Sequence, residues 1–189
     1  MKSKKLGMFI FVASIVMVIA GSICVFVISL NADREETQKR MGVVNKEFES
    51  FNETITTFEA ERDSLYTEYF GNVFYDTLET NDPIIKTKLT NYEKVVNDIT
   101  KKADAMKDLC EDVYYPDSSV NSKCSDYKLI YEQVVNYFVE DVKLYNDTIN
   151  TFNEQQAAAG STFALMAYKT EFDYIDYNKD GSFDGKEVK

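Results

Sequence analysis

The sequence predicts an all-α fold, with a single N-terminal transmembrane helix followed by an antiparallel, coiled-coil-like bundle of three to four helices. Three observations support this prediction. A long stretch near the N-terminus carries no charge, apolar residues recur every three to four positions through most of the rest, and the 189 residues include only two Pro and seven Gly. Few helix-breaking residues and a repeat of three to four positions indicate long, uninterrupted helices.

The uncharged stretch Leu6–Leu30 is the predicted membrane anchor. As a helix it is about 37 Å long at ~1.5 Å per residue, which is enough to cross a hydrocarbon core of about 30 Å. Lysines precede it within residues 1–5, and acidic residues begin just after it, at Asp33. The positive-inside rule therefore places the N-terminus in the cytoplasm and the chain after Asn31 outside the cell membrane.

Two alternatives to an uncleaved anchor are a signal peptide and a pilin-like leader. The apolar region of a signal peptide is normally about 7–15 residues, and this one is longer. Cleavage after Ala32 would place Leu30 where a small residue is needed. A pilin-like leader would end at Gly7, but Val12 stands where common pilins carry a glutamate.

Residues 31–160 are predicted to form the extracytoplasmic bundle. The expected helices run from Arg34 to about Glu79, from Pro83 to about Val113, and from Cys124 or Ser125 to about Phe152. A short fourth helix, from Phe163 to about Ile175, is expected to follow. Each long helix has apolar residues in alternating steps of three and four, as the seam of a coiled coil requires. The first seam contains Met41, Val44, Phe48, Phe51, Ile55, Phe58, Leu65 and Tyr69, with Arg62 as its one polar interruption. The second contains Ile85, Leu89, Tyr92, Val96, Ile99, Ala103, Met106, Cys110 and Val113, and the third contains Tyr127, Tyr131, Val134, Phe138, Tyr145 and Phe152.

Prolines mark the two predicted connections between these helices. Asp82 precedes Pro83, and this order predicts an N-cap followed by the first residue of a helix. Residues 115–119 form a turn-prone cluster that includes the second proline.

Cys110 and Cys124 bracket this second turn and are predicted to form a disulfide. Both lie in phase with the seams of their helices, so an antiparallel hairpin brings them together. The compartment outside the membrane permits oxidation. The alternative is a pair of buried free thiols.

Composition restricts the classes of function. The net charge is −11, so the surface repels phosphate backbones and nucleic-acid binding is not expected. The sequence contains no His, which is the commonest general base. It also offers no nucleophile with a matching base and no glycine-rich phosphate loop. We therefore predict that the protein is not an enzyme.

The last part of the chain, residues 161–189, contains a motif rich in oxygen donors. From Asp176 to Glu187 it matches the pattern D-x-[DN]-x-[DN]-G-x5-E at every specified position. The segment resembles the calcium loop of the EF-hand family and the related dockerin loop, and Glu187 favours the EF-hand. The resemblance implies a Ca²⁺ cofactor bound by Asp176, Asn178, Asp180, Ser182, Asp184 and Glu187.

Two departures from the family stand beside this resemblance. The sequence ends at Lys189, soon after the loop, and it contains no second loop of this pattern. The alternatives are a loop that no longer binds calcium and an acidic tail that matches by chance.

Together these features predict a single-pass membrane protein whose extracytoplasmic domain binds calcium and acts as a structural or protein-interaction module. A protein partner or a homo-oligomer is expected. Two alternatives remain at this point. The first is a sensor-like helical domain that binds a small ligand, and the second is a pilin-like filament subunit.

Overall fold

The computed structural model describes the backbone of residues 2–70, 78–111, 113–170 and 172, and side chains from Asp33 onward within these ranges. The described residues form the helices α1 (Lys2–Glu68), α2 (Leu78–Cys110) and α3 (Ser118–Ala158), and they contain no strand. The predicted all-α class is therefore confirmed.

The chain divides into two compact units, Met1–Val43 and Val44–Lys189. The first unit contains the N-terminal part of α1. Across the part of the chain that the structure describes, no helix is both long and apolar enough to cross a membrane. The predicted anchor, Leu6–Leu30, lies where side chains are not described, so it stays a prediction.

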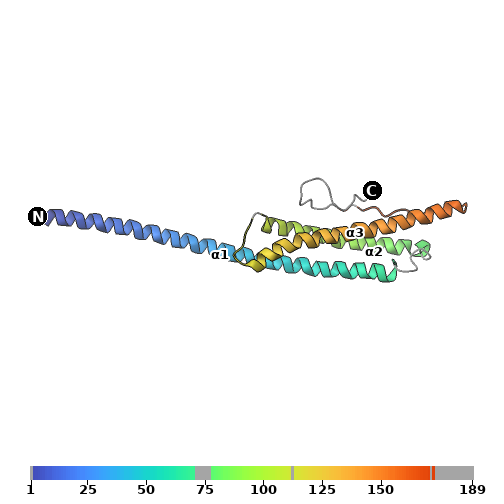
Figure 1. Ribbon diagram of the computed structural model, residues 1–189, viewed down its shortest axis with the longest axis horizontal. Coiled ribbons are helices and arrows are strands. Elements are labelled where there is room, and N and C mark those ends of the chain that lie inside the picture. The colour runs from blue at the N-terminus through green and yellow to red at the C-terminus, as the bar shows by residue number, and fades with distance from the viewer. Residues whose placement is uncertain (1, 71–77, 112, 171, 173–189) are drawn as a thin grey trace. The chain divides into compact units, whose positions relative to one another are not determined.

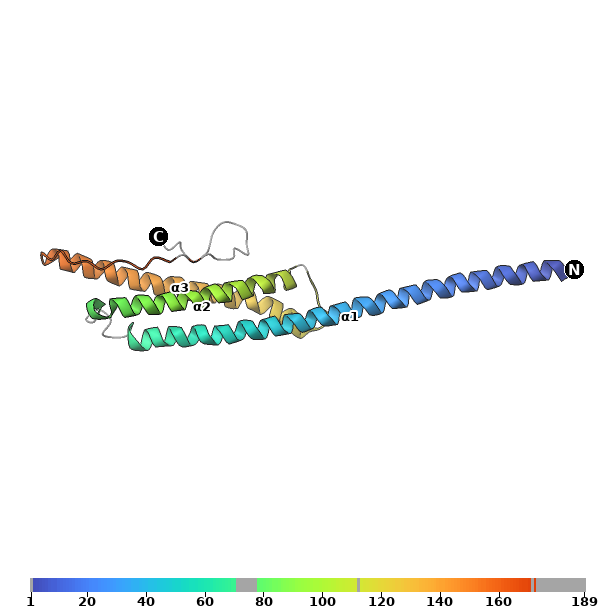
Figure 2. The same ribbon diagram turned by 180° about the vertical axis from the view of Figure 1, so that it is seen from behind.

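The second unit is a three-helix bundle in which each helix runs antiparallel to the next (Figure 1). On α1 and α2, Lys102 donates to Ser50 Oγ at 2.9 Å, whereas Lys88 donates to Ser64 Oγ at 2.6 Å. Residues later in α1 thus contact residues earlier in α2, as two antiparallel helices require. The view from behind shows α2 and α3 side by side along the same part of the bundle (Figure 2).

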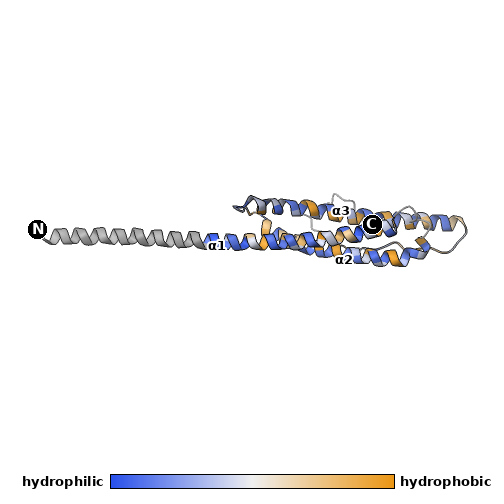
Figure 3. Cartoon of the chain, turned by 90° about the horizontal axis from the view of Figure 1, so that it is seen from below, coloured by the Kyte–Doolittle hydropathy of each residue, from blue (hydrophilic) through white to orange (hydrophobic). Residues whose placement is uncertain are grey.

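The core of the bundle is built from the predicted seams. Hydrophobic residues recur at intervals along each helix of the bundle (Figure 3). On α1 the buried seam residues after Val43 are Val44, Phe51, Phe58 and Leu65. On α2 they are Ile85, Leu89, Tyr92, Val96, Ile99, Ala103 and Met106, and on α3 they are Tyr127, Tyr131, Val134, Phe138, Tyr145 and Phe152.

Two of the predicted helix boundaries are wrong by several residues at the connection between α1 and α2. The first helix was expected to continue to about Glu79, but α1 ends at Glu68, where Phe70 N–H donates to the Leu65 carbonyl at 2.9 Å. The second helix begins at Leu78, so Pro83 lies inside α2 and Asp82 is not its N-cap. A tertiary contact accounts for the different role of Asp82, because its buried carboxylate accepts a hydrogen bond from the Tyr145 hydroxyl of α3.

The third helix begins earlier than predicted, at Ser118. Its N-cap is Asp117, whose carboxylate accepts a hydrogen bond of 2.8 Å from Ser119 N–H. Hydrogen bonding from the Ser119 side chain, followed by this bond from its backbone N–H, lowers the pKa of Asp117. Asn121 secures the approach to the helix, because its side chain accepts from Tyr115 N–H at 2.9 Å and donates to the Tyr115 carbonyl at 2.7 Å. The cluster read as a turn is therefore partly a helix cap.

The predicted fourth helix does not form in the part of its range that the structure describes. Residues 161–170 follow α3 without helical structure and run back along it (Figure 1). The reversal takes place at Gly160, whose φ of 78° lies in the left-handed region that favours glycine. We call residues 161–172 the strap. Its backbone bonds to side chains of α3, which replaces the hydrogen bonds that a helix would make internally.

The predicted disulfide is confirmed. Cys110 at the end of α2 and Cys124 in the second turn of α3 are bonded, with their Cα atoms 5.4 Å apart. The bond closes a loop of sequence separation 14 between two antiparallel helices.

We expect replacement of both Cys110 and Cys124 by Ser to lower the free energy of unfolding by about 3 kcal/mol, because the unfolded chain loses a cross-link. Helicity should be retained, since both seams remain. Thermal unfolding followed by circular dichroism, with and without reductant, measures the change. An unaltered melting temperature after reduction would show that the disulfide does not stabilise the bundle.

Candidate functional site

A carboxylate without solvent exposure lies at the centre of the bundle. Asp141 of α3 is 0% exposed. Its Oδ2 accepts from Arg62 Nε at 2.8 Å and from the Tyr92 hydroxyl at 3.1 Å. Its Oδ1 accepts from Arg62 Nη2 at 3.2 Å and from the Tyr66 hydroxyl at 2.6 Å. Side chains from all three helices therefore converge on one carboxyl group, which we call the Asp141 network.

Two aromatic rings lie against the cation of this network. The Arg62 guanidinium carbon lies 4.0 Å from the ring centroid of Tyr137 and 5.0 Å from that of Tyr66. The hydrogen bond to Asp141 is the main reason that the pKa of Arg62 is raised. Burial, followed by the proximity of Asp141, raises the pKa of Tyr92, so its phenol stays a hydrogen-bond donor. The buried Asp141 carboxylate is thus matched by one cation and two phenol donors.

The sequence contains a signal for this network in the polar positions of its apolar seams. Arg62 was identified as the polar interruption of the first seam. Asp141 occupies the equivalent step of the third seam, between Phe138 and Tyr145. Opposite charges that interrupt two otherwise apolar seams indicate a pair across helices. Tyr92 was expected in the core, but its role as a donor required the structure.

A second buried carboxylate, Asp82, lies near the start of α2. It forms an ion pair of 2.9 Å with Lys86 on the same helix and accepts a hydrogen bond from the Tyr145 hydroxyl of α3. Burial and this bond raise the pKa of Tyr145. Asp82 was predicted as a helix cap, and nothing in its local sequence indicated a partner on α3.

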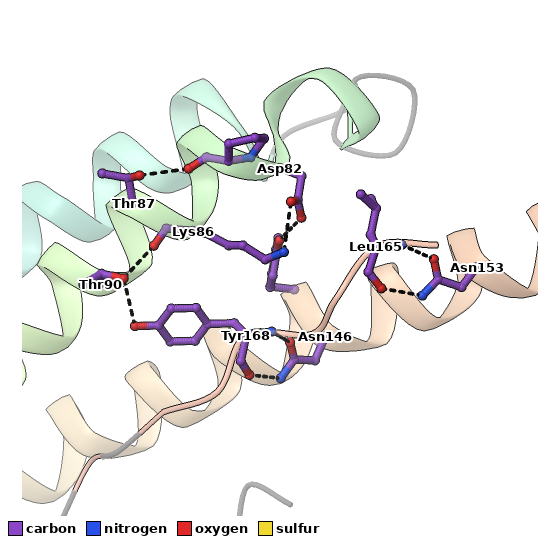
Figure 4. A network of polar contacts seen from close by, with 10 residues as sticks. Asp82, Lys86, Thr87, Thr90, Asn146, Asn153, Leu165 and Tyr168 are labelled. Atoms are coloured by element: carbon purple, nitrogen blue, oxygen red, sulfur yellow. Dashed lines mark hydrogen bonds and ion pairs between the residues drawn. The ribbon is translucent and has the colours of Figure 1, made fainter. Parts of the chain in front are cut away.

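Two asparagines of α3 hold the backbone of the strap (Figure 4). Asn153 accepts from Leu165 N–H at 2.7 Å and donates to the Leu165 carbonyl at 2.8 Å. Asn146 makes the same pair of bonds to Tyr168, at 2.7 and 3.0 Å. Each amide thus offers one residue of the strap the donor and acceptor that a neighbouring β-strand would offer.

A third buried carboxylate, Glu93 of α2, binds two side chains of the strap. Glu93 is 9% exposed. It accepts from the Tyr168 hydroxyl at 2.5 Å and from the Thr170 hydroxyl at 2.8 Å. Burial raises the pKa of Tyr168 to about 12, and the bond to Glu93 adds to this effect.

Edge-to-face ring pairs hold both ends of the strap on α3. Phe163 contacts Phe152 with ring centroids 6.3 Å apart, and Phe172 contacts Phe138 at 5.6 Å. We define the strap-binding face as the residues of α2 and α3 that make these contacts: Glu93, Phe138, Asn146, Phe152 and Asn153.

The predicted calcium ligands lie at residues 176–187, outside the described residues, so the structure does not test them. Within the described ranges, no group of three or more Cys, Asp or Glu side chains is placed to hold a metal ion. Of the predicted site residues, the structure brings together Cys110 and Cys124.

Comparison of the chain with protein-family models, with curated proteins and with solved structures found no match.

The three buried carboxylates act as acceptors that join elements distant in sequence. Asp141 joins all three helices, Asp82 joins α2 to α3, and Glu93 joins α2 to the strap. Each accepts at least one tyrosine hydroxyl. The arrangement is suited to assembly and to holding a segment in place.

We expect Asp141→Ala to lower the free energy of unfolding by about 2–4 kcal/mol, because it leaves the buried Tyr92 hydroxyl and the partly exposed Arg62 guanidinium without their acceptor. The control combines Arg62→Met, Tyr92→Phe and Asp141→Leu, which replaces the network by apolar groups and should cost much less. Urea unfolding measures both. If Asp141→Ala changed stability by no more than about 0.5 kcal/mol, as at an ordinary surface position, the network would not hold the bundle together.

We expect alkaline pH to release the strap. Because the docked strap holds the neutral phenol, the contribution of Tyr168 is fully present below the ordinary pKa of 10.0 and is lost as the pH rises toward 12. The methyl NMR signal of Met166, whose side chain is 73% exposed on the strap, reports the release. In Tyr168→Phe, which lacks the titrating hydroxyl, the signal should stay constant through this range. An identical titration in both proteins would assign the release to another group.

Proposed function

We propose that this protein is a single-pass membrane protein whose extracytoplasmic helical bundle binds Ca²⁺ through a C-terminal loop and serves as a protein-interaction module. The observation that carries the proposal is the loop Asp176–Glu187, in which every specified position of the calcium pattern is filled. Its donors are all oxygens, which a hard cation such as Ca²⁺ requires.

The disulfide supports the extracytoplasmic location. Disulfides persist in oxidising compartments and are rare in the cytosol. Cys110 and Cys124 both follow the uncharged stretch Leu6–Leu30, so anchoring by that stretch would leave them outside the membrane.

The strap supports a link between the bundle and the loop. Its last described residue, Phe172, contacts Phe138 of α3, and the loop begins soon after it, at Asp176. The bundle therefore holds the chain at Phe172, four positions before the first residue of the loop. The polar groups that converge inside the bundle bond to one another, which favours a structural role over the binding of a small ligand.

We expect calcium titration of the protein to show one weak site, with a dissociation constant of about 10⁻⁴ to 10⁻³ M, as in extracellular modules. Glu187→Gln should abolish the site, because the residue is expected to supply two oxygens and to close the loop. Isothermal calorimetry measures both proteins. Magnesium should compete poorly, since its octahedral shell does not suit a bidentate carboxylate.

The matched control is Asp173→Asn, which removes one negative charge outside the pattern and should leave calcium binding unchanged. An equal loss of calcium binding in both variants would indicate that the overall negative charge of the tail, and not the loop pattern, attracts the ion. No heat at millimolar calcium would refute the calcium loop and leave an acidic tail.

A further inference from the structure

The strap-binding face contacts the strap through its backbone as well as through its side chains. Asn146 and Asn153 each bond to both the N–H and the carbonyl of a single strap residue. These four bonds require an extended backbone and are independent of the side chains of Leu165 and Tyr168. The face is therefore built to hold an extended peptide.

The spacing of the two asparagines matches the repeat of an extended chain. They are seven residues apart on α3, which is about 10.5 Å along a helix at ~1.5 Å per residue. Leu165 and Tyr168 are three residues apart on the strap, which is about 9 Å at the ~3.1 Å rise of a polyproline-II-like chain, whose three-residue turn places both residues on the same side. The two lengths differ by only about 1 Å, so the spacing of the amides suits a chain of this kind.

Side chains define which extended peptide fits. Glu93 accepts from hydroxyl groups at two strap positions, Tyr168 and Thr170. Phe152 and Phe138 pack against rings near the two ends, Phe163 and Phe172. The peptide shown to make all of these contacts is the strap itself.

Each of these contacts joins the strap to α2 or α3, so a strap from a second copy would make the same set. What holds it on its own chain is the reversal at Gly160, after α3 ends at Ala158. A short reversal between two packed segments is the usual hinge of a segment exchange between protomers. The chain has a net charge of −11, but the strap contains one Lys and one Glu, so its own charge does not oppose docking on another copy.

We propose that the strap-binding face takes the strap of a second copy of this chain, so that two copies exchange straps and form a dimer. This names a partner for the interaction module and rests on that part of the proposed function. The exchange involves neither the calcium loop nor the anchor. Experiments with the full chain in mild detergent and a calcium chelator therefore test it separately from calcium binding.

The first test is complementation between two variants of the full chain. One carries Asn146→Ala and Asn153→Ala, so its face is defective and its strap is intact. The other carries Leu165→Pro and Tyr168→Pro, which remove the N–H groups that the asparagines bind, so its strap is defective and its face is intact. Each alone should be monomeric by light scattering, and an equimolar mixture should form a heterodimer.

A third chain that carries all four changes is the control for association through the detergent or the anchor. It should pair with neither variant, and circular dichroism should show that all three chains keep their helices. A mixture that stays monomeric while both proteins remain helical would overturn the proposal, and so would equal association of the control.

A synthetic peptide of residues 161–172 tests recognition of the backbone directly. It should bind the chain with the defective strap, measured by fluorescence anisotropy. N-methylation at Leu165 or at Tyr168 should weaken binding roughly tenfold for each group, since each removes one hydrogen bond and leaves an asparagine oxygen without its donor. N-methylation at Met166, which lies between the two residues that the asparagines bind, should weaken binding less. Equal effects at all three positions, or no binding, would contradict recognition of the backbone by the asparagines.

Gly160→Ala tests the hinge without touching the contacts. A Cβ built at Gly160 meets nothing within 4 Å, so the substitution acts only through the positive φ. Strain at such a position should disfavour the reversal by roughly 5- to 30-fold and raise the dimer fraction accordingly. An unchanged dimer fraction would show that the reversal does not control the exchange.

Discussion

The buried carboxylate of Asp141 determines how the three helices align. Apolar seams with a repeat of three and four can slide by a heptad and still bury similar side chains. The charged residues cannot slide in this way, because Asp141 has 0% exposure and would lose its bonds to Arg62 and Tyr92 after any such shift. An unpaired buried charge costs several kcal/mol, so one register is strongly preferred. The disulfide between Cys110 and Cys124 holds the same register at one end of the bundle.

The same type of contact recurs where the chain adds an element to the bundle. Asp82 and Glu93 each bind a tyrosine hydroxyl, as Asp141 does. A tyrosine places an apolar ring in the core and a donor at the end of it, so it can satisfy a buried carboxylate without introducing a second charge. The core therefore gains specific polar contacts while remaining largely aromatic and aliphatic.

Asparagine amides perform the corresponding task for the backbone. Asn121 holds Tyr115 before α3, and Asn146 and Asn153 hold the strap after it. Each amide bonds to both polar groups of one residue, so an irregular segment can lie on a helix without leaving its backbone unsatisfied. This is the physical basis for treating the strap as a docked peptide, and it links the bundle to the proposed roles of the C-terminal region.

Periodicity in the sequence was sufficient to predict the helical class, the faces of α1, α2 and α3, and the pairing of Cys110 with Cys124. Such patterns are local, because the side chains that share a helix face lie three or four positions apart. Only the tertiary structure decided the partners of Asp141, Asp82 and Glu93, since each lies on another element of the fold. It also decided that residues 161–170 are a strap, although their apolar side chains had predicted a helix. The reason is that amides of α3, distant in the sequence, bind the backbone that a helix would have bonded to itself.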